Sequence, residues 1–288
     1  MTLHDLQARL TADLKAAGVT DAAFEAKQLL YAAFDLDATS YLLSRFRTVE
    51  QGDADRVLSL AQRRAAGEPL QYLLGCWSFL DDVFSVGPGV LIPRPETEAL
   101  TLQCEAFLKE RKAPVVYDLC AGSGCIGLTL QKRCQNARVF LIEQSDVALR
   151  YLRKNAAKLA DPARTTILQG DVLQGAEAFT SLPKADLIVS NPPYIPTAEL
   201  PGLQREVQRE PRMALDGGAD GLLFYRCFAN LWRSALRPDG MFAFECGEGQ
   251  GKDIAALFAA YGMQAEIQFD LQGLDRFVFV TQGRKENA

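Results

Sequence analysis

The sequence has 288 residues, of which 48% are hydrophobic, so it is long enough for about two domains with buried cores. Its net charge of -5 argues against extended, nonspecific binding to nucleic acid or to anionic membranes, because both require a basic surface. The single histidine, His4, lies close to the start of a predicted helix, which disfavours mechanisms that need a histidine base or a histidine-rich metal site.

The cysteines include no CxxC pair, a pattern typical of reduced thiols in a cytosolic protein rather than of a metal site. The first residues lack a basic segment followed by an apolar one, and no apolar run approaches the length of a membrane span. We therefore expect a soluble, cytoplasmic protein that binds no metal and does not enter membranes.

Residues 1–72 are predicted to form a small helical domain. Leucines at positions 3, 6, 10 and 14 fall on one face of a helix, and the apolar residues from Phe24 to Phe34 predict a second one. The tetrapeptide Thr48-Val49-Glu50-Gln51 resembles a capping box at the start of a further helix that contains Val57 and Ala61. No group in this domain is recognisable as catalytic.

Residues 73–93 are predicted to link this domain to the next. Trp77-Ser78-Phe79 and the segment from Val83 to Val86 are typical of a β-hairpin. In the following segment, Leu91 to Glu98, Pro95 is expected in the first turn of a helix, where the acids Glu96 and Glu98 favour the positive end of the helix dipole.

Residues 94–288 alternate between strand and helix patterns, which predicts an α/β domain with a mostly parallel sheet. A loop-rich insert is expected from Tyr194 to about Gly221, followed by a helix to Leu236. The last two predicted strands have no helix between them, so the sheet should end with an antiparallel pair. Strands are expected at 115–119, 138–142, 165–168, 185–189, 241–245, 265–269 and 276–281, and further helices at 124–132, 146–158 and 252–261.

The first predicted strand leads into a glycine-rich loop. Glycines at 122, 124 and 127 permit a tight turn, close approach of a ligand to the backbone and close packing of the next helix. Such a loop is equally suited to a dinucleotide, so by itself it does not identify the ligand. The candidate cofactor residues of this loop are Asp118, Cys120, Ala121, Gly122, Ser123 and Gly124.

Two further acids follow the next two strands. Glu143 ends the second strand, where a carboxylate can accept hydrogen bonds from both hydroxyls of a ribose. Asp171, which precedes Val172, is placed to meet an adenine amino group, although an acid at this position is equally often a simple helix cap. With Asp118, these acids suit a cationic ligand better than a pyrophosphate, which favours S-adenosylmethionine over NAD.

A fourth strand ends at the tetrapeptide Asn191-Pro192-Pro193-Tyr194. Proline has no amide hydrogen to donate, so the strand must stop there. The Asn191 side-chain oxygen and the Pro192 carbonyl together can accept both hydrogens of a planar NH2 group. An Asn-Pro-Pro triplet is also compatible with an ordinary turn, and the upstream cofactor residues favour the functional interpretation.

At this point the sequence resembles a known family. The loop from Asp118 to Gly124 and Glu143 resemble the cofactor site of class I methyltransferases, whose sheet is Rossmann-like, and the 191–194 motif resembles the signature of enzymes that methylate planar nitrogens. The segments from Glu68 to Gly75 and from Leu91 to Glu98 resemble those of the HemK-type peptide chain release factor N5-glutamine methyltransferases. The resemblance to this family extends over nearly the whole chain.

The resemblance implies a reaction and a partner. The substrate would be the glutamine of the Gly-Gly-Gln motif in bacterial class 1 release factors, methylated at N5 with S-adenosylmethionine as donor and S-adenosylhomocysteine as product. Residues 1–72 would recognise the release factor, and Arg94 and Glu210-Pro211 would shape the rim of the site. The chain departs from the common pattern at Cys120-Ala121 and at Glu143, where relatives often have Gly-Thr and Asp. The resemblance assigns catalysis and substrate contact to Asn191, Pro192, Pro193 and Tyr194.

Three alternatives remain. The same pocket would accept the amino group of adenine N6 in a nucleic acid after base flipping, but the acidic composition and the lack of a basic, aromatic-rich domain predict no stable nucleic-acid binding. A ribosomal protein L3 glutamine methyltransferase is disfavoured by Arg94-Pro95-Glu96-Thr97-Glu98. A noncatalytic cofactor-binding protein is disfavoured because Asn191 and Pro192 are both present.

Overall fold

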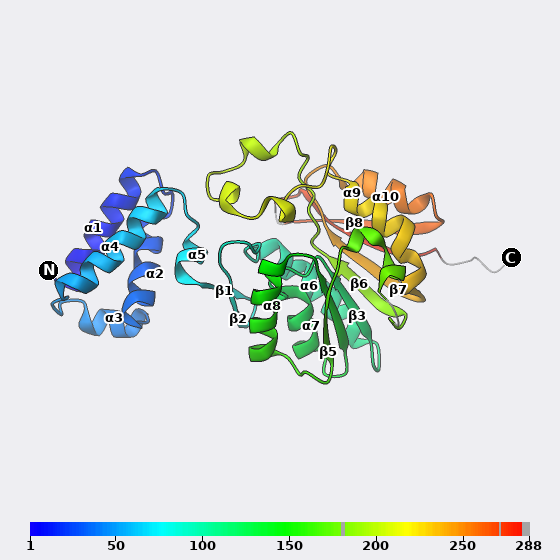
Figure 1. Cartoon of the computed structure of the whole chain (residues 1–288), viewed down its shortest axis with the longest axis horizontal. Coiled ribbons are helices and arrows are strands. Elements are labelled where there is room, and N and C mark those ends of the chain that lie inside the picture. The colour runs from blue at the N-terminus through cyan, green and yellow to red at the C-terminus, as the bar shows by residue number, and fades with distance from the viewer. Residues whose placement is uncertain (180–181, 271, 284–288) are drawn as a thin grey trace. The chain divides into compact units, whose positions relative to one another are not determined.

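The computed structural model describes residues 1–179, 182–270 and 272–283 (Figure 1). The chain divides into two compact units. The first contains Met1–Trp77 together with Gln204–Arg209, and the second contains Ser78–Leu203 and Glu210–Ala288. No sequence pattern indicated that the short segment Gln204–Arg209 would join the first unit.

The first unit is helical, and its core lies where the leucine pattern predicted. Leu3, Leu6, Leu10 and Leu14 are all buried. The second predicted helix is confirmed; Ala22 and Leu29 lie on its buried face, and Phe24 is 51% exposed. The helices are α1 (Leu3–Ala16), α2 (Ala22–Phe34), α3 (Ala38–Ser44), α4 (Gln51–Ala65) and α5 (Leu70–Leu74).

The prediction of a capping box before α4 was wrong. Thr48 forms a β-bridge with Thr2, and Glu50 caps α4 without a side-chain hydrogen bond. Thr48 is held extended before the helix and is not available as its cap. Capping boxes occur instead at the starts of α1 and α3, with Thr2 and Asp37 as the N-caps.

Arg64 joins three parts of the first unit. It is only 7% exposed, and its guanidinium binds Glu25 of α2 and, at 2.7 Å, Glu206 of the segment Gln204–Arg209. A buried arginine needs its partners, because an unpaired charge away from water is costly. This ion pair therefore holds the segment in the first unit.

The linking hairpin and the proline-started helix were predicted correctly. Strands β1 (Cys76–Phe79) and β2 (Asp82–Ser85) form a two-stranded sheet. Helix α6 (Pro95–Lys109) has Arg94 as its N-cap and two acids in its first turn.

Within the described residues of the second unit, seven strands form one sheet in the order β5-β4-β3-β6-β7-β9-β8. Five neighbouring strands are parallel, and β9 is antiparallel to both β7 and β8, which confirms the predicted class I methyltransferase-type sheet. The strands are β3 (Val115–Leu119), β4 (Arg138–Glu143), β5 (Thr165–Gln169), β6 (Ala185–Ser190), β7 (Leu236–Glu245), β8 (Met263–Phe269) and β9 (Asp275–Gln282).

Helices cover both faces of this sheet (Figure 1). On one face lie α6, α7 (Cys125–Arg133) and α8 (Asp146–Leu159), and on the other α9 (Leu223–Cys227) and α10 (Gly251–Ala259). Successive strand residues alternate between the two cores, so Val116 packs on the α6–α8 face and Tyr117 on the opposite one. This alternation decides which strand-end side chains can meet.

The helix predicted to reach Leu236 is irregular. After α9 the chain continues as a π-helical segment, Phe228–Trp232, and a 3-10 turn, Arg233–Ala235. Strand β7 then begins at Leu236, earlier than expected, and a register shift against β6 leaves residues 237–240 bulged out of the ladder. A periodic apolar pattern does not distinguish these helix types.

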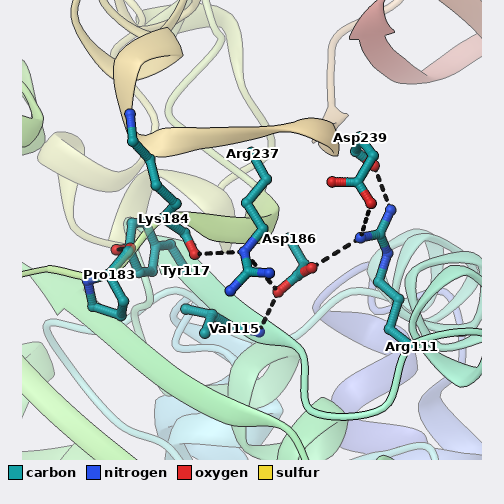
Figure 2. Close-up of polar contacts among 8 residues, drawn as sticks. All are labelled: Arg111, Val115, Tyr117, Pro183, Lys184, Asp186, Arg237 and Asp239. Carbon is teal, nitrogen blue, oxygen red and sulfur yellow. Dashed lines mark hydrogen bonds and ion pairs between the residues drawn. The ribbon is translucent and has the colours of Figure 1, made fainter.

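The bulge supplies charges to a buried carboxylate at the amino ends of β3 and β6. Asp186 accepts a hydrogen bond from the Val115 amide at 2.8 Å and pairs with Arg111 at 2.8 Å and Arg237 at 3.6 Å (Figure 2). Arg111 also reaches Asp239. The cluster ties the bulge of β7 to the two central strands.

We expect Asp186→Ala to lower the free energy of unfolding by about 3 kcal/mol, because it leaves the buried Val115 amide without an acceptor and removes a shared partner of Arg111 and Arg237. Asp239→Ala is the matched control: its side chain is 73% exposed, so its loss should cost less than about 1 kcal/mol. Urea unfolding of both variants measures the difference, and equal costs would contradict a buried anchor at Asp186.

Candidate active site

A cavity opens at the carboxyl ends of β3, β4, β5 and β6, where ligands of parallel α/β sheets bind. Nine of the residues predicted to bind cofactor or substrate line it. They are Arg94, Cys120, Ala121, Gly122, Ser123, Glu143, Val172, Asn191 and Pro193.

The loop after β3 is shaped by left-handed backbone. Cys120, Gly122 and Gly124 all have positive φ, of 61°, 54° and 82°, and Gly124 is the N-cap of α7. Gly124 adopts such angles without steric cost, whereas Cys120 carries strain of about 1 kcal/mol. The loop therefore accommodates a cysteine at this left-handed position at an energetic cost.

Glu143 holds this loop and the next one together. Its carboxylate accepts the Gly122 amide at 2.8 Å and the Ser145 amide at 2.7 Å, one on each oxygen. Burial raises the pKa of Glu143, while these backbone hydrogen bonds oppose the rise. Because a carboxylate can accept about four hydrogen bonds, two acceptor positions remain for a ligand in the cavity.

Asp118 and Gly124 lie outside the cavity lining. Strand alternation turns Asp118 toward α7, where its Oδ2 accepts the Gly127 amide at 2.8 Å. Its Oδ1 is buried and has no hydrogen-bond partner among the described residues, and burial raises the pKa of this carboxyl to about 7. In this structure Asp118 braces the glycine loop from below.

Asp171 also lies outside the lining, next to Val172, which is part of it. Its Oδ1 accepts the Leu173 amide at 2.9 Å and caps the 3-10 turn Val172–Gln174. The capping role that the sequence left open is thus present here, and one carboxylate oxygen remains for other contacts.

The motif after β6 is rigidly held. The Asn191 Nδ2 donates to the Thr97 hydroxyl at 3.1 Å, which leaves Oδ1 of Asn191 without a partner among the described residues. Gly217 packs directly on the motif, since a Cβ there would lie 2.8 Å from the Pro193 carbonyl oxygen and 2.7 Å from the Tyr194 Cα. Pro192 and Tyr194 do not line the cavity themselves.

Tyr194 is fixed from several sides. Its carbonyl accepts the Gln250 Nε2 at 2.9 Å, and its half-buried ring packs against the core on the α9–α10 face. Burial raises the pKa of its hydroxyl. The plug over the strand end that the sequence left open is therefore part of its role.

Arg94 and Glu210, which were predicted to shape the rim of the site, contact each other. The Arg94 guanidinium pairs with Glu210, whose other oxygen accepts the Ile92 amide at 3.0 Å. Glu210 is 6% exposed. The pair holds the segment before α6 against the insert, beside Pro211, which also lines the cavity.

Sequence reasoning missed several lining residues, most notably Thr97, Phe224 and Met213. Thr97 stood within the motif that carried the resemblance, in the first turn of α6, but the sequence did not indicate its contact with Asn191. Met213 comes from the irregular insert and Phe224 from α9, where no sequence pattern indicates the direction of a side chain.

Solved methyltransferases share this fold. The catalytic domain of hMettl16, in complex with a MAT2A 3'UTR hairpin, covers 91% of this chain and 91% of its own with a TM-score of 0.56 at 13% identity. A methyltransferase from Pyrococcus furiosus covers 69% of this chain and 88% of its own with a TM-score of 0.50 at 16% identity. The chain has the class I methyltransferase fold, with a cavity at the strand ends.

Two family models match the chain. Residues 5–75 match the PrmC N-terminal domain, and residues 99–216 match the methyltransferase small domain. A release factor glutamine methyltransferase from Moorella thermoacetica is 39% identical over 99% of this chain and 100% of its own. A release factor glutamine methyltransferase from Geobacter sulfurreducens is 39% identical over 91% of this chain and 90% of its own. The chain belongs to the release factor glutamine methyltransferase family, as the sequence predicted.

The described residues contain neither a membrane-spanning helix nor a cluster of metal ligands. None of their helices has the length and apolar character that a membrane span requires. In the same residues, no group of three or more His, Cys, Asp or Glu side chains is arranged to hold a metal ion.

Proposed function

We propose that this protein methylates the N5 amide nitrogen of the glutamine in the Gly-Gly-Gln motif of class 1 peptide chain release factors, with S-adenosylmethionine as donor. The family and the names of its members support the substrate. The observation that carries the proposal is the Asn191 side chain, which lies at the cavity with Nδ2 engaged and Oδ1 available as an acceptor.

The residues at the cavity fit the proposed donor. Glu143 has two acceptor positions left for the ribose hydroxyls, and Ile142 and Phe224 offer an apolar surface for a base. The carboxylate also suits a cationic ligand. When bound, S-adenosylmethionine supplies an electrophilic methyl group on its sulfonium, and S-adenosylhomocysteine is the product.

The chemical difficulty is that an amide nitrogen is a poor nucleophile, because its lone pair is shared with the carbonyl. Acceptors at Asn191 Oδ1 and the Pro192 carbonyl would orient the NH2 group and bind it more strongly as positive charge develops on nitrogen. Holding the nitrogen in near-attack geometry contributes further, up to about 7 to 11 kcal/mol in the ideal limit. As the new N–C bond forms, the methyl–sulfur bond breaks, and a proton then leaves the nitrogen to water.

Other residues would act around this centre. Pro193 lines the cavity beside the incoming amide, and Tyr194 would exclude water from it. Arg94, paired with Glu210, would contact the protein substrate at the rim. We assign recognition of the release factor body to the helical first unit, because a tripeptide alone buries too little surface for a specific interface. The predicted compartment is that of the substrate, the cytoplasm.

The test uses labelled S-adenosylmethionine with three substrates: a release factor, the same factor with its Gly-Gly-Gln glutamine replaced by Ala, and double-stranded DNA. We expect label on the first alone. Label on DNA would support an adenine-N6 activity, and label on the glutamine-free factor would place the modification elsewhere; either result would overturn the proposal.

A further inference from the structure

A buried carboxylate that the proposed mechanism does not use is linked to Asn191 through one intervening side chain. Glu245, the last residue of β7, is 1% exposed, and its Oε2 accepts the Thr97 hydroxyl at 2.6 Å. The Thr97 oxygen in turn accepts the Asn191 Nδ2 at 3.1 Å. These three side chains form a continuous chain of hydrogen bonds from β7 through α6 to the cavity.

The fold brings them together by strand alternation. Met241 and Ala243 of β7 pack on the α6–α8 face, so Glu245, two residues further, turns to the same face. Thr97 lies in the first turn of α6 on that face and is 2% exposed. Asn191 follows the end of β6, the strand paired with β7.

The direction of the hydrogen bonds follows from donor arithmetic. A threonine hydroxyl has one hydrogen, and an ionised carboxylate is an acceptor only. When Glu245 takes the Thr97 hydrogen, Thr97 can offer Asn191 only a lone pair, so Asn191 must present its NH2 to Thr97. Its oxygen is then left for the substrate side.

We propose that Glu245 is a positioning residue that acts through the Thr97 hydroxyl to fix the Asn191 amide with its oxygen toward the substrate nitrogen. The inference rests on the proposed function and deepens it. A freely rotating Asn191 amide would present its NH2 group to the glutamine NH2 half of the time. Two hydrogen-bond donors would then face each other, and the glutamine nitrogen would not be held for methyl transfer.

Protonation of Glu245 removes this control. A protonated carboxyl can donate to Thr97, which can then donate to Asn191 Oδ1 and reverse its amide. Burial raises the pKa of Glu245 to about 7, so the ionised form that the mechanism needs is gained as pH rises through that value. The titratable and charged groups around Glu245 are Arg94, Glu96, Cys125, Tyr194, Tyr225, Cys246 and Arg276.

The first experiment compares wild type, Thr97→Val and Thr97→Ser in release factor methylation, with cofactor affinity measured by calorimetry. We expect Thr97→Val to lower kcat by about tenfold to a hundredfold with cofactor affinity little changed, and Thr97→Ser to recover most of the loss. A fall in kcat matched by an equal fall in cofactor affinity, or no recovery by serine, would overturn the inference.

The second experiment records kcat from about pH 5.5 to about pH 9. Wild-type kcat should rise with pH through about 7, and Glu245→Gln, which cannot ionise, should lose that step. Asp118→Asn is the matched control, because the pKa of Asp118 is also raised to about 7 and this variant should keep the step.

Failure of the proposed function and failure of the positioning role of Glu245 give different results. Absence of methylation by the wild type would overturn the proposed function and this inference with it. An active wild type whose Thr97→Val variant has the same kcat, or a pH step that survives in Glu245→Gln, overturns the inference alone.

Discussion

Asn191→Ala should bind S-adenosylmethionine with an affinity within about threefold of wild type and methylate the release factor at least about a hundredfold more slowly. The side-chain oxygen of Asn191 is assigned to the substrate nitrogen that accepts the methyl group and not to the nucleoside, so its loss acts on the reaction and spares cofactor binding. Calorimetry gives the affinity, and single-turnover methylation gives the rate.

Asn230→Ala provides the matched control for that variant. Asn230 is an exposed asparagine whose only recorded side-chain contact in the described structure is a hydrogen bond from the Tyr261 hydroxyl, and it lies outside the cavity lining. Its replacement should leave both quantities unchanged. If Asn191→Ala lost cofactor affinity and rate to the same extent, the side chain would have been assigned to the wrong ligand.

Glu143→Ala should show the opposite division, with cofactor affinity lower by about a hundredfold and kcat at saturating cofactor much less affected. The variant removes the acceptors proposed for the ribose hydroxyls. It also leaves the Gly122 and Ser145 amides without their partner, so the glycine loop loses its support. Cofactor titration by calorimetry and a kcat measurement at high cofactor concentration separate the two effects.

Asp146→Ala is the control for the loss of an acid at this edge of the sheet. Asp146 is exposed, binds Gln169 and does not line the cavity. Unchanged cofactor affinity in Asp146→Ala, together with the loss in Glu143→Ala, would identify a specific contact. Similar losses in both would indicate a general electrostatic effect.

The residues that sequence predicted well are those placed by strand ends. Glu143, Asn191 and the glycine loop were found because parallel strands bring their carboxyl ends to one edge, and all three line the cavity. The same rule applied to β7 would have indicated Glu245, which ends the neighbouring strand.

Two candidate cofactor residues lie outside the cavity lining for a different reason. Asp118 and Asp171 were grouped with Glu143 by position along the chain, yet alternation turns Asp118 toward α7, and a local turn engages Asp171. The direction of a side chain depends on one residue of register, which a sequence pattern rarely fixes. Likewise, Thr48 fits a capping box until the bridge to Thr2 is known.

The passage of Gln204–Arg209 into the helical unit means that the polypeptide crosses between the two units three times, after residues 77, 203 and 209. The helical portion is thus not an appendage that can be cut away at a single point. Excision of residues 1–77 would leave Glu206 without Arg64, in an insert that begins at the end of the 191–194 motif and contains Glu210, the partner of Arg94. A protein truncated in this way should therefore have a less stable insert than the full chain, even though the cavity itself is formed by the second unit.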